Sequence, residues 1–445
     1  MHHPVTTEPV CTYWTTGDNM RPTNLVKLFR ICCIFLLMTA LSARAAEDSI
    51  EKIAKDSRCA RGLAWIDKNS AWLTDRQIQI TEIPAPEFGE GPRGEFMKKE
   101  FEAAGLKVQT DKTGNVIAVR PGSDTKNVVL FAAHLDTVFP AGTDVHVKRN
   151  GDRLEAPGIS DNGAGLAALL GLARALSESG VATAKTIVLA ADVGEEGEGN
   201  LRGIRALVES YGSRLSAVIA VDGASTDHVT TQGIASRRFE VTITGPGGHS
   251  WSDFGAPNPI TALSRGIVRF SSIHLPDDPR SSFNFGVIEG GTSVNSIPAR
   301  VVVKIDLRSE DDSELNRMES ALRDAMQAGI KEEMGVMPDA RLDSDPLEVK
   351  FRSLGARPAG KISESSPFFE TVQSVERYLG NRSRSERSST DANIPLSAGI
   401  PAIAIGGGGK GGGSHTLAEW YDPTERELGL KRLFLIALST AGIQP

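Results

Sequence analysis

The sequence predicts an α/β protein built from two domains, one of which is inserted into the other. Three observations predict it. Short apolar runs alternate with helical patterns up to residue 235, a different order of elements begins at 236, and the first pattern resumes after 357. Alternating strands and helices are typical of a three-layer α/β/α domain with a mostly parallel sheet. We therefore expect one such domain, formed by 46–235 and 358–445, and an inserted α+β domain at 236–357.

The first part of the main domain begins with helical spacing over 48–79 and 95–106. Four short apolar runs follow, which predict buried strands at 115–119, 127–133, 186–191 and 216–221. A long apolar segment, 163–178, predicts a helix buried within this domain. In the second part we expect a helix at 366–379, a strand at 400–405 and a final helix at 424–441.

The inserted segment opens on "RRFEVTITG", which alternates like a half-exposed strand. The elements expected after it are a helix at 257–273, strands at 283–289 and 300–307, a helix at 312–334 and a strand at 346–352. This βαββαβ order predicts a ferredoxin-like sandwich whose sheet has one open face.

Composition excludes several classes of protein. The 445 residues are 40% hydrophobic and 24% charged, which is ordinary for a globular protein. The net charge is −7 and no long basic tract occurs, so we expect no nucleic-acid partner. Of four cysteines only Cys59 lies beyond residue 45. A metal site in the remaining chain must therefore use histidine and carboxylate ligands.

The N-terminal segment resembles a signal peptide. From Met20, the expected start, a basic stretch precedes the apolar run 31–41, and Ala43-Arg44-Ala45 fits a cleavage site. We treat 1–19 as an upstream extension and expect export to the periplasm or beyond, with no stable membrane insertion after cleavage. The alternative is an uncleaved membrane anchor.

Polar side chains gather where the predicted strands of the main domain end. They are His134, Asp136, Asp161, Glu195, Glu196, Asp222 and His415. Ligands of open α/β sheets bind at this edge, and period-two geometry places His134 and Asp136 on one face. Each residue alone could be structural, but together they suit zinc, with manganese or cobalt as substitutes. Two ions about 3.5 Å apart need a shared carboxylate, and Asp161 is central in the set.

Eight motifs in order resemble the co-catalytic di-zinc exopeptidase family, which includes carboxypeptidase G, peptidase T, aminoacylase and succinyl-diaminopimelate desuccinylase. They are "HLDTV", "GISDNGAG", "GEEGEG", "VDG", "GPGGHSW", "GGTSVNSIPAR", "IDLR" and "SHTLAEW", and the similarity runs from about residue 60 to the C-terminus. The resemblance implies a catalytic domain and an inserted lid and dimerisation domain. It also implies two zinc ions, one held by His134 and Asp222, the other by Glu196 and His415, with Asp161 between them.

The resemblance further implies the roles of the residues beside the metal ligands. Glu195 would be the general base for a metal-bridged hydroxide, Asp136 would orient His134, and the Asp161–Asn162 bond would be cis. Asp391 in "STDANIPL" matches a position that shapes the site.

The inserted domain supplies residues that the resemblance assigns to substrate. His249 would stabilise the oxyanion in the partner subunit of a homodimer, although an exposed turn histidine is the alternative. Asn295 and Arg308 would bind the polar backbone or carboxylate of the substrate, yet Asp306 could simply pair with Arg308. In the main domain, the glycine-rich run that includes Gly413 would let the backbone approach the substrate closely beside His415, although a flexible loop is the alternative.

The expected activity is hydrolysis of an amide bond next to a free terminus. Asp222 stands where relatives with Asp are more often aminopeptidases or dipeptidases, which favours short peptides as substrates. The alternatives are an N-acyl-amino-acid deacylase, a glutamate-type carboxypeptidase, or a peptidase-like binding domain without activity. No Gly-x-Ser-x-Gly motif supports a serine hydrolase, and "GGGGKGGG" lacks the Ser or Thr of a phosphate loop.

Overall fold

The computed structural model describes residues 48–336 and 346–445. The expected signal peptide and upstream extension at 1–45 lie outside the described residues. Within those residues, no helix combines the length and the apolar character that crossing a membrane requires.

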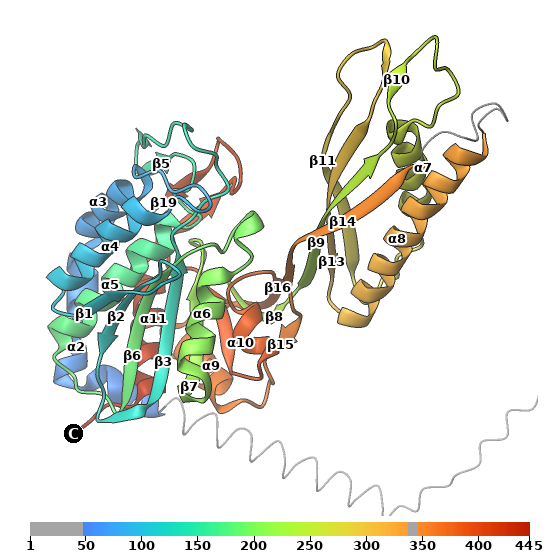
Figure 1. The fold of residues 1–445 in the computed structure, drawn as a ribbon. Helices are drawn as coiled ribbons and strands as arrows, with labels where there is room; N and C mark the ends of the chain where they lie inside the picture. Colours follow the sequence, from blue (N-terminus) through green and yellow to red (C-terminus); the bar gives the residue numbers. More distant parts are fainter. Residues whose placement is uncertain (1–47, 337–345) are drawn as a thin grey trace, which may run out of the picture.

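A nine-stranded mixed sheet forms the centre of the larger domain in the described part of the chain (Figure 1). Its strands in spatial order are β1 (Lys107–Thr110), β2 (Val116–Arg120), β6 (Lys185–Asp192), β3 (Asp124–His134), β7 (Leu215–Val221), β17 (Ala402–Ile405), β8 (His228–Gly233) and β15 (Gly360–Lys361), with β16 (Arg384–Ser388) paired with β8. The central strands β6, β3, β7 and β17 are parallel, as predicted. Antiparallel strands extend the sheet at both ends.

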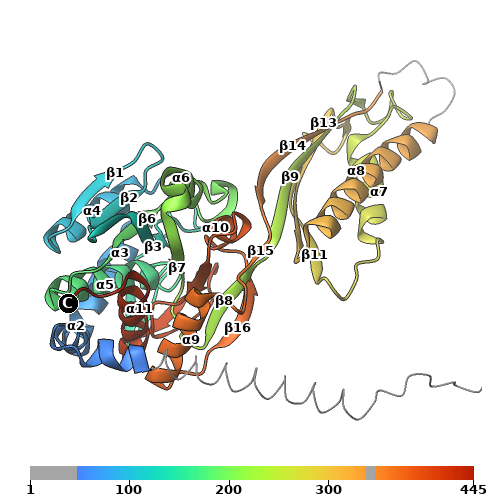
Figure 2. The same cartoon turned by 90° about the horizontal axis from the view of Figure 1, so that it is seen from below.

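Helices cover both faces of this sheet, which confirms the three-layer fold. Figure 2 shows α5 and α11 on one face and α6 on the other. The helices are α2 (Ser57–Lys68), α3 (Ser70–Thr81), α4 (Gly91–Ala103), α5 (Gly163–Ser179), α6 (Arg202–Tyr211), α9 (Pro367–Leu379), α10 (Asn393–Ser397) and α11 (Arg426–Ala441). Helix α5 is apolar around most of its surface, as expected for a helix that is buried on nearly all sides.

The N-terminus of α5 places one of the expected ligands. Asn162 caps the helix, since its side-chain oxygen accepts a hydrogen bond from Gly165 N at 3.1 Å. Asp161 therefore lies immediately before the first turn. The Asp161–Asn162 bond is cis, as the resemblance implies.

The inserted domain is a four-stranded antiparallel sheet with two helices on one face. Its elements are β9 (Ala235–Thr244), α7 (Pro259–Ser271), β11 (Ser281–Gly290), β13 (Arg300–Ser309), α8 (Asp312–Gly335) and β14 (Glu348–Arg357). The order β11-β13-β9-β14 is the ferredoxin-like arrangement that the sequence predicts. The chain enters this sheet after Gly233 and returns to the large sheet at Gly360.

Two smaller sheets were not predicted. The strands β10 (Gly248–His249) and β12 (Ser296–Ile297) pair at the end of the inserted domain that lies away from the large sheet (Figure 1). The other small sheet comprises β4 (Lys148–Asn150), β5 (Arg153–Glu155), β18 (Lys410–Gly412) and β19 (Trp420–Asp422). Part of the glycine-rich run 406–413 is thus a strand, and the turn between β18 and β19 carries His415.

Candidate active site and metal centre

The carboxyl ends of the parallel strands place the first group of expected ligands. Strand β3 ends at His134, whose side chain is only 2% exposed. Its Nε2 lies 3.2 Å from Asp161 Oδ1 and 3.7 Å from Asp222 Oδ1. Asp222 directly follows β7, the neighbour of β3 in the sheet. One imidazole and two carboxylates therefore converge at a single point.

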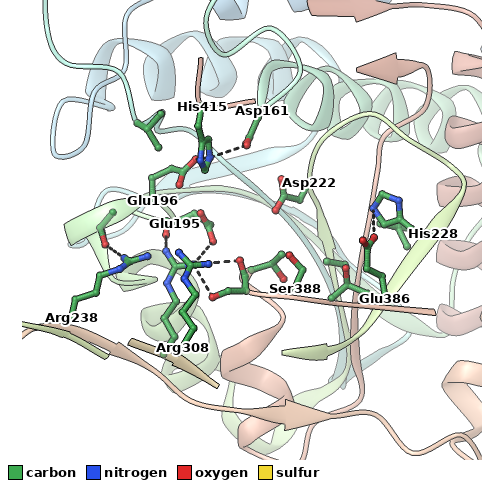
Figure 3. Close-up of a pocket in the computed structure, with 18 residues that line it drawn as sticks. Asp161, Glu195, Glu196, Asp222, His228, Arg238, Arg308, Glu386, Ser388 and His415 are labelled. Carbon is green, nitrogen blue, oxygen red and sulfur yellow. Dashed lines mark hydrogen bonds and ion pairs between the residues drawn. The ribbon is translucent and has the colours of Figure 1, made fainter. Parts of the chain in front are cut away.

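A second group lies on the other side of Asp161 (Figure 3). His415 Nε2 is 3.3 Å from Asp161 Oδ2 and 2.9 Å from Glu196 Oε1. The two carboxylate oxygens of Asp161 thus face different histidines. Each group has ligand atoms close enough to hold one ion, with Asp161 common to both.

Asp136 contacts His134 differently from the sequence expectation. Since β3 ends at His134, the strand geometry does not extend to Asp136. The His134 ring instead lies 3.1 Å from the main-chain carbonyl of Asp136, while the carboxylate is 3.7 Å away. That carboxylate accepts hydrogen bonds from the backbone amides of Glu195 and Glu196, at 3.0 and 2.8 Å. Asp136 therefore positions both the histidine and the two glutamates.

Glu195 has a partner that the sequence did not reveal. Arg357, at the end of β14, donates from Nη1 to Glu195 Oε1 at 2.9 Å, and both side chains are buried. Burial raises the pKa of Glu195, and Arg357 opposes that effect. Glu195 also lies near His134 and Glu196 in a geometry that could hold an ion. Its pairing with Arg357 instead favours a position beside the metal ligands.

Glu419 holds the loop before Asp161. Its carboxylate is fully buried and accepts hydrogen bonds from the backbone amides of Gly158, Ser160 and Asp161, at 2.8, 2.8 and 2.7 Å. The motif "SHTLAEW" contains this residue, but no sequence pattern indicated its contact with residues about 260 positions away.

The ligands open onto a pocket of about 530 Å³ between the two domains. Two of its walls come from the open face of the inserted sheet, which contributes Arg238 and Arg308, and from β8 and β16, which contribute His228 and Glu386. Arg308 thus lines the same pocket as Asp161, Glu196 and His415. Its Nε donates to Asp306 at 2.7 Å, so the alternative pairing with Asp306 is present as well.

His249 and Asn295 lie together but away from this pocket. Both are in or beside the β10–β12 pair, and Ser250 N donates to the Asn295 carbonyl at 2.9 Å. His249 is exposed, and its Nδ1 accepts from the Trp251 amide at 3.2 Å. Within one chain these two residues do not meet the metal ligands (Figure 1).

Gly413 and Asp391 have supporting positions. Gly413 has a φ of 72°, and its carbonyl accepts from the Thr416 amide, which forms the turn that presents His415. It does not line the pocket. Asp391 is buried, and it interacts with the buried Asp192 at the end of β6.

The side chains fit a metal centre. Asp161 Oδ1 is buried and accepts no hydrogen bond within the described residues, although His134 Nε2 lies 3.2 Å away. The carboxylates of Asp161 and Glu196 raise the pKa of His415 to about 11. The same two carboxylates that favour the protonated imidazole would also favour a metal ion at this position, in place of the proton.

Comparisons with known proteins identify a family. The model of Peptidase family M20/M25/M40 matches residues 130–439. The protein named "Uncharacterized protein YqjE" from Bacillus subtilis (strain 168) is 24% identical over 76% of this chain and 90% of its own length. Carboxypeptidase G2 from Pseudomonas sp. (strain RS-16) is 26% identical over 53% of this chain and 58% of its own length.

A solved structure shares the fold. The aminopeptidase PepT from Bacillus cereus superposes with a TM-score of 0.65 at 20% identity, covering 84% of this chain and 99% of that one. The family match includes all five expected metal ligands, from His134 to His415. This family comprises metal-dependent hydrolases of amide bonds. The chain therefore belongs to Peptidase family M20/M25/M40.

Proposed function

We propose that this protein is a zinc-dependent hydrolase that cleaves an amide bond next to a free terminus of short peptides. One observation carries the proposal: the two oxygens of Asp161 face two separate histidines, each with a further carboxylate beside it. A shared carboxylate between two ligand groups is the arrangement that a two-metal hydrolase requires.

The ligand assignment follows from the two groups. His134 and Asp222 would hold one zinc ion, Glu196 and His415 the other, and Asp161 both. Manganese or cobalt could substitute, because imidazole and carboxylate ligands accept those ions too. When bound, the two cations would make a water molecule more acidic and polarise the carbonyl of the substrate.

The residues of the chain would then handle the protons. Glu195 would take the proton of the attacking water and return it to the leaving amine. Two contacts support a position of Glu195 beside the ligands rather than among them: its side chain accepts from Arg357, and its backbone amide donates to Asp136. Burial keeps its proton affinity high, which suits a group that must accept a proton and release it within one turnover.

His249 and Asn295 would act in the partner subunit of a homodimer. They lie at the far end of the inserted domain, where Trp251 and Val294 are also exposed. Exposed apolar residues beside two expected substrate contacts favour an interface at this end. His249 would donate to the oxyanion of the partner's substrate.

Whether the protein is an aminopeptidase or dipeptidase, or instead a deacylase or carboxypeptidase, depends on which end of the substrate it recognises. Asp222 favours an aminopeptidase or dipeptidase, and one structural relative is named an aminopeptidase. The alternative is an N-acyl-amino-acid deacylase or glutamate-type carboxypeptidase, and one relative is named carboxypeptidase G2. Arg308 in the pocket suits both, since short peptides and N-acyl amino acids each carry a free carboxylate.

Substrate profiling tests the proposal. We expect the zinc-loaded protein to hydrolyse members of a dipeptide and tripeptide library, and to leave the same peptides intact when their amino ends are acetylated. Cleavage of the acetylated peptides alone would instead support the deacylase or carboxypeptidase alternative. Absence of hydrolysis across both sets, with zinc bound, would leave a binding domain as the remaining function.

We also propose that residues 20–45 direct export from the cytoplasm. N-terminal sequencing of the protein recovered outside the cytoplasm should begin near residue 46. Retention of the apolar run in the mature protein would contradict cleavage.

A further inference from the structure

We propose that Arg238 is a specificity-determining residue which, together with Arg308, forms a carboxylate-binding subsite beside the metal ligands. The proposal rests on the function proposed above and adds Arg238 to Arg308 as a residue that recognises the free carboxylate of the substrate. Both arginines line the pocket that contains Asp161, Glu196 and His415. Figure 3 shows the two guanidinium groups rising from the inserted domain toward Glu195.

The strand register brings the two arginines together. Strands β9 and β13 are antiparallel neighbours in which Arg238 lies opposite Asp306, and Ser236 lies opposite Arg308. Alternate residues of a strand point to the same face, so Arg238, Asp306 and Arg308 share the open face of the sheet. The helices α7 and α8 pack on the other face and leave this one for a ligand (Figure 2).

The charges of this group do not balance. Asp306 accepts from Arg308 Nε at 2.7 Å and lies 3.5 Å from Arg238 Nε. One carboxylate therefore serves two guanidinium groups, while the nearby Arg357 pairs with Glu195. The side chain of Arg238 is only 16% exposed. A partly buried excess positive charge favours an anion, and a guanidinium group binds a carboxylate through two parallel hydrogen bonds.

Arg238 differs from Arg308 in how firmly it is held. Its Nη1 donates to the carbonyl of Gly197, the residue after Glu196, so it connects the inserted sheet to the metal-ligand loop. Arg308 is 42% exposed and, among the described residues, uses only its Nε to bind Asp306. The subsite thus combines one fixed donor and one adjustable donor, and it lies where the two domains meet.

The chain offers a matched control one residue away. Arg237 points to the opposite face of the same strand, where it binds Glu319 and Asn316 of α8. Its replacement by glutamine removes the same charge at nearly the same place in the sequence, but not from the pocket.

The test measures binding without turnover. Arg238→Gln, Arg238→Lys and Arg237→Gln are each made in a zinc-loaded Glu195→Gln protein. Calorimetry then compares the binding of Ala-Ala with that of its C-terminal amide, and the binding of acetyl-Ala-Ala with that of its C-terminal amide. The effect of the carboxylate can then be measured whether the protein binds a free or an acetylated amino end. We expect the parent protein to prefer the acids. Arg238→Gln should weaken binding of the acids about 10- to 100-fold and leave the amides nearly unchanged, as expected for a lost charged hydrogen-bond pair.

Arg238→Lys should retain part of the preference, because it keeps the charge without the two-pronged geometry, and Arg237→Gln should retain all of it. An unchanged preference for the acids in Arg238→Gln, or no such preference in the parent protein, would overturn the subsite. Since no hydrolysis is measured, failure of the proposed activity would leave this result standing, and failure here would leave the activity standing.

Discussion

The metal-ligand edge of the large sheet and the far end of the inserted domain hold different parts of the proposed machinery, and they differ most in burial. At the edge, the side chains of His134 and Glu196 are 2% and 8% exposed. At the far end, Trp251 is 86% and Val294 fully exposed. The edge is fixed by its own chain through strand ends, backbone amides and buried ion pairs. At the far end the contacts are made by exposed groups, such as the Trp251 amide that donates to His249 Nδ1, and exposure is the property expected of a surface that functions against another subunit.

The substitution with the largest expected effect on activity lies at the metal-ligand edge. Glu195→Gln should lower kcat about 100- to 10,000-fold, because glutamine cannot accept the proton of the attacking water. Zinc binding should be unchanged if Glu195 lies beside the ligands rather than among them. Steady-state kinetics and metal analysis of the same sample measure both quantities. Loss of zinc together with activity would make Glu195 a ligand.

The far end is tested by complementation between two inactive variants. His249→Ala should lower kcat about 100-fold or more, the usual effect of losing an oxyanion donor. In a mixed dimer with Glu195→Gln, one site would combine an intact Glu195 with the partner's intact His249. Mixing and re-associating the two variants should therefore restore up to about a quarter of the wild-type activity in a symmetric dimer.

An absence of recovery in verified mixed dimers would contradict the sharing of sites between subunits. His274→Ala, in the same domain but without an expected role, serves as the control and should retain full activity.

The buried support of the edge is tested through Glu419. Glu419→Gln replaces one of the acceptor oxygens by an NH₂ group, so at least one of the three backbone amides loses its partner. We expect zinc affinity to fall about 10- to 100-fold, as is common when the support of a ligand is removed. Competition with a zinc chelator measures the change. Replacement of the exposed Glu425 by glutamine should leave the zinc affinity unaltered. An equal loss of zinc affinity in Glu425→Gln would contradict a specific role for the buried contacts of Glu419.

The smallest effect concerns the pH dependence of stability. Burial raises the pKa of Asp192 to about 7 and the pKa of Asp391 well above its usual range. The folded protein therefore keeps protons that the unfolded chain releases above about pH 4, and this contribution to stability is lost as the pH rises toward 7. Asp391→Asn removes one such proton, so the fall in unfolding free energy should flatten by about 1.4 kcal/mol per pH unit. Urea denaturation between these pH values provides the measurement, and an unchanged slope would contradict the shifted pKa.

The regular elements of both domains could be predicted from local pattern. The helix expected at 312–334 is α8 (Asp312–Gly335), whose N-cap Asp311 accepts from the backbone amides of Ser313 and Glu314. Four of the expected ligands could be proposed from local pattern, because His134, Glu196 and Asp222 end or shortly follow an apolar strand and Asp161 precedes an apolar helix. His415 lies farther from the nearest apolar strand, β17, and was proposed from the family motif. These signals lie within a few residues of the feature they predict.

The supporting contacts could not be predicted in the same way. Arg357 and Glu195 are 162 positions apart, and Arg357 is the last residue of an ordinary strand with no special spacing. Arg238 was visible only as part of an alternating strand, and its partner Gly197 belongs to the other domain. The contact of His134 with the carbonyl of Asp136 depends on where β3 ends, which residue types do not determine. Tertiary packing, rather than local sequence, decides all three.

A zinc titration that compares the wild-type protein with Asp161→Ala tests whether Asp161 is shared by two metal positions. Metal-free wild-type protein should bind two zinc ions per chain, with amide hydrolysis appearing as the second ion binds, and the titration should release protons from the two histidines. Asp161→Ala should lose tight binding at both positions, because both ligand groups share that carboxylate. Binding of a single ion by the wild-type protein, or of two ions by Asp161→Ala with unchanged affinity, would contradict a two-metal centre built around Asp161.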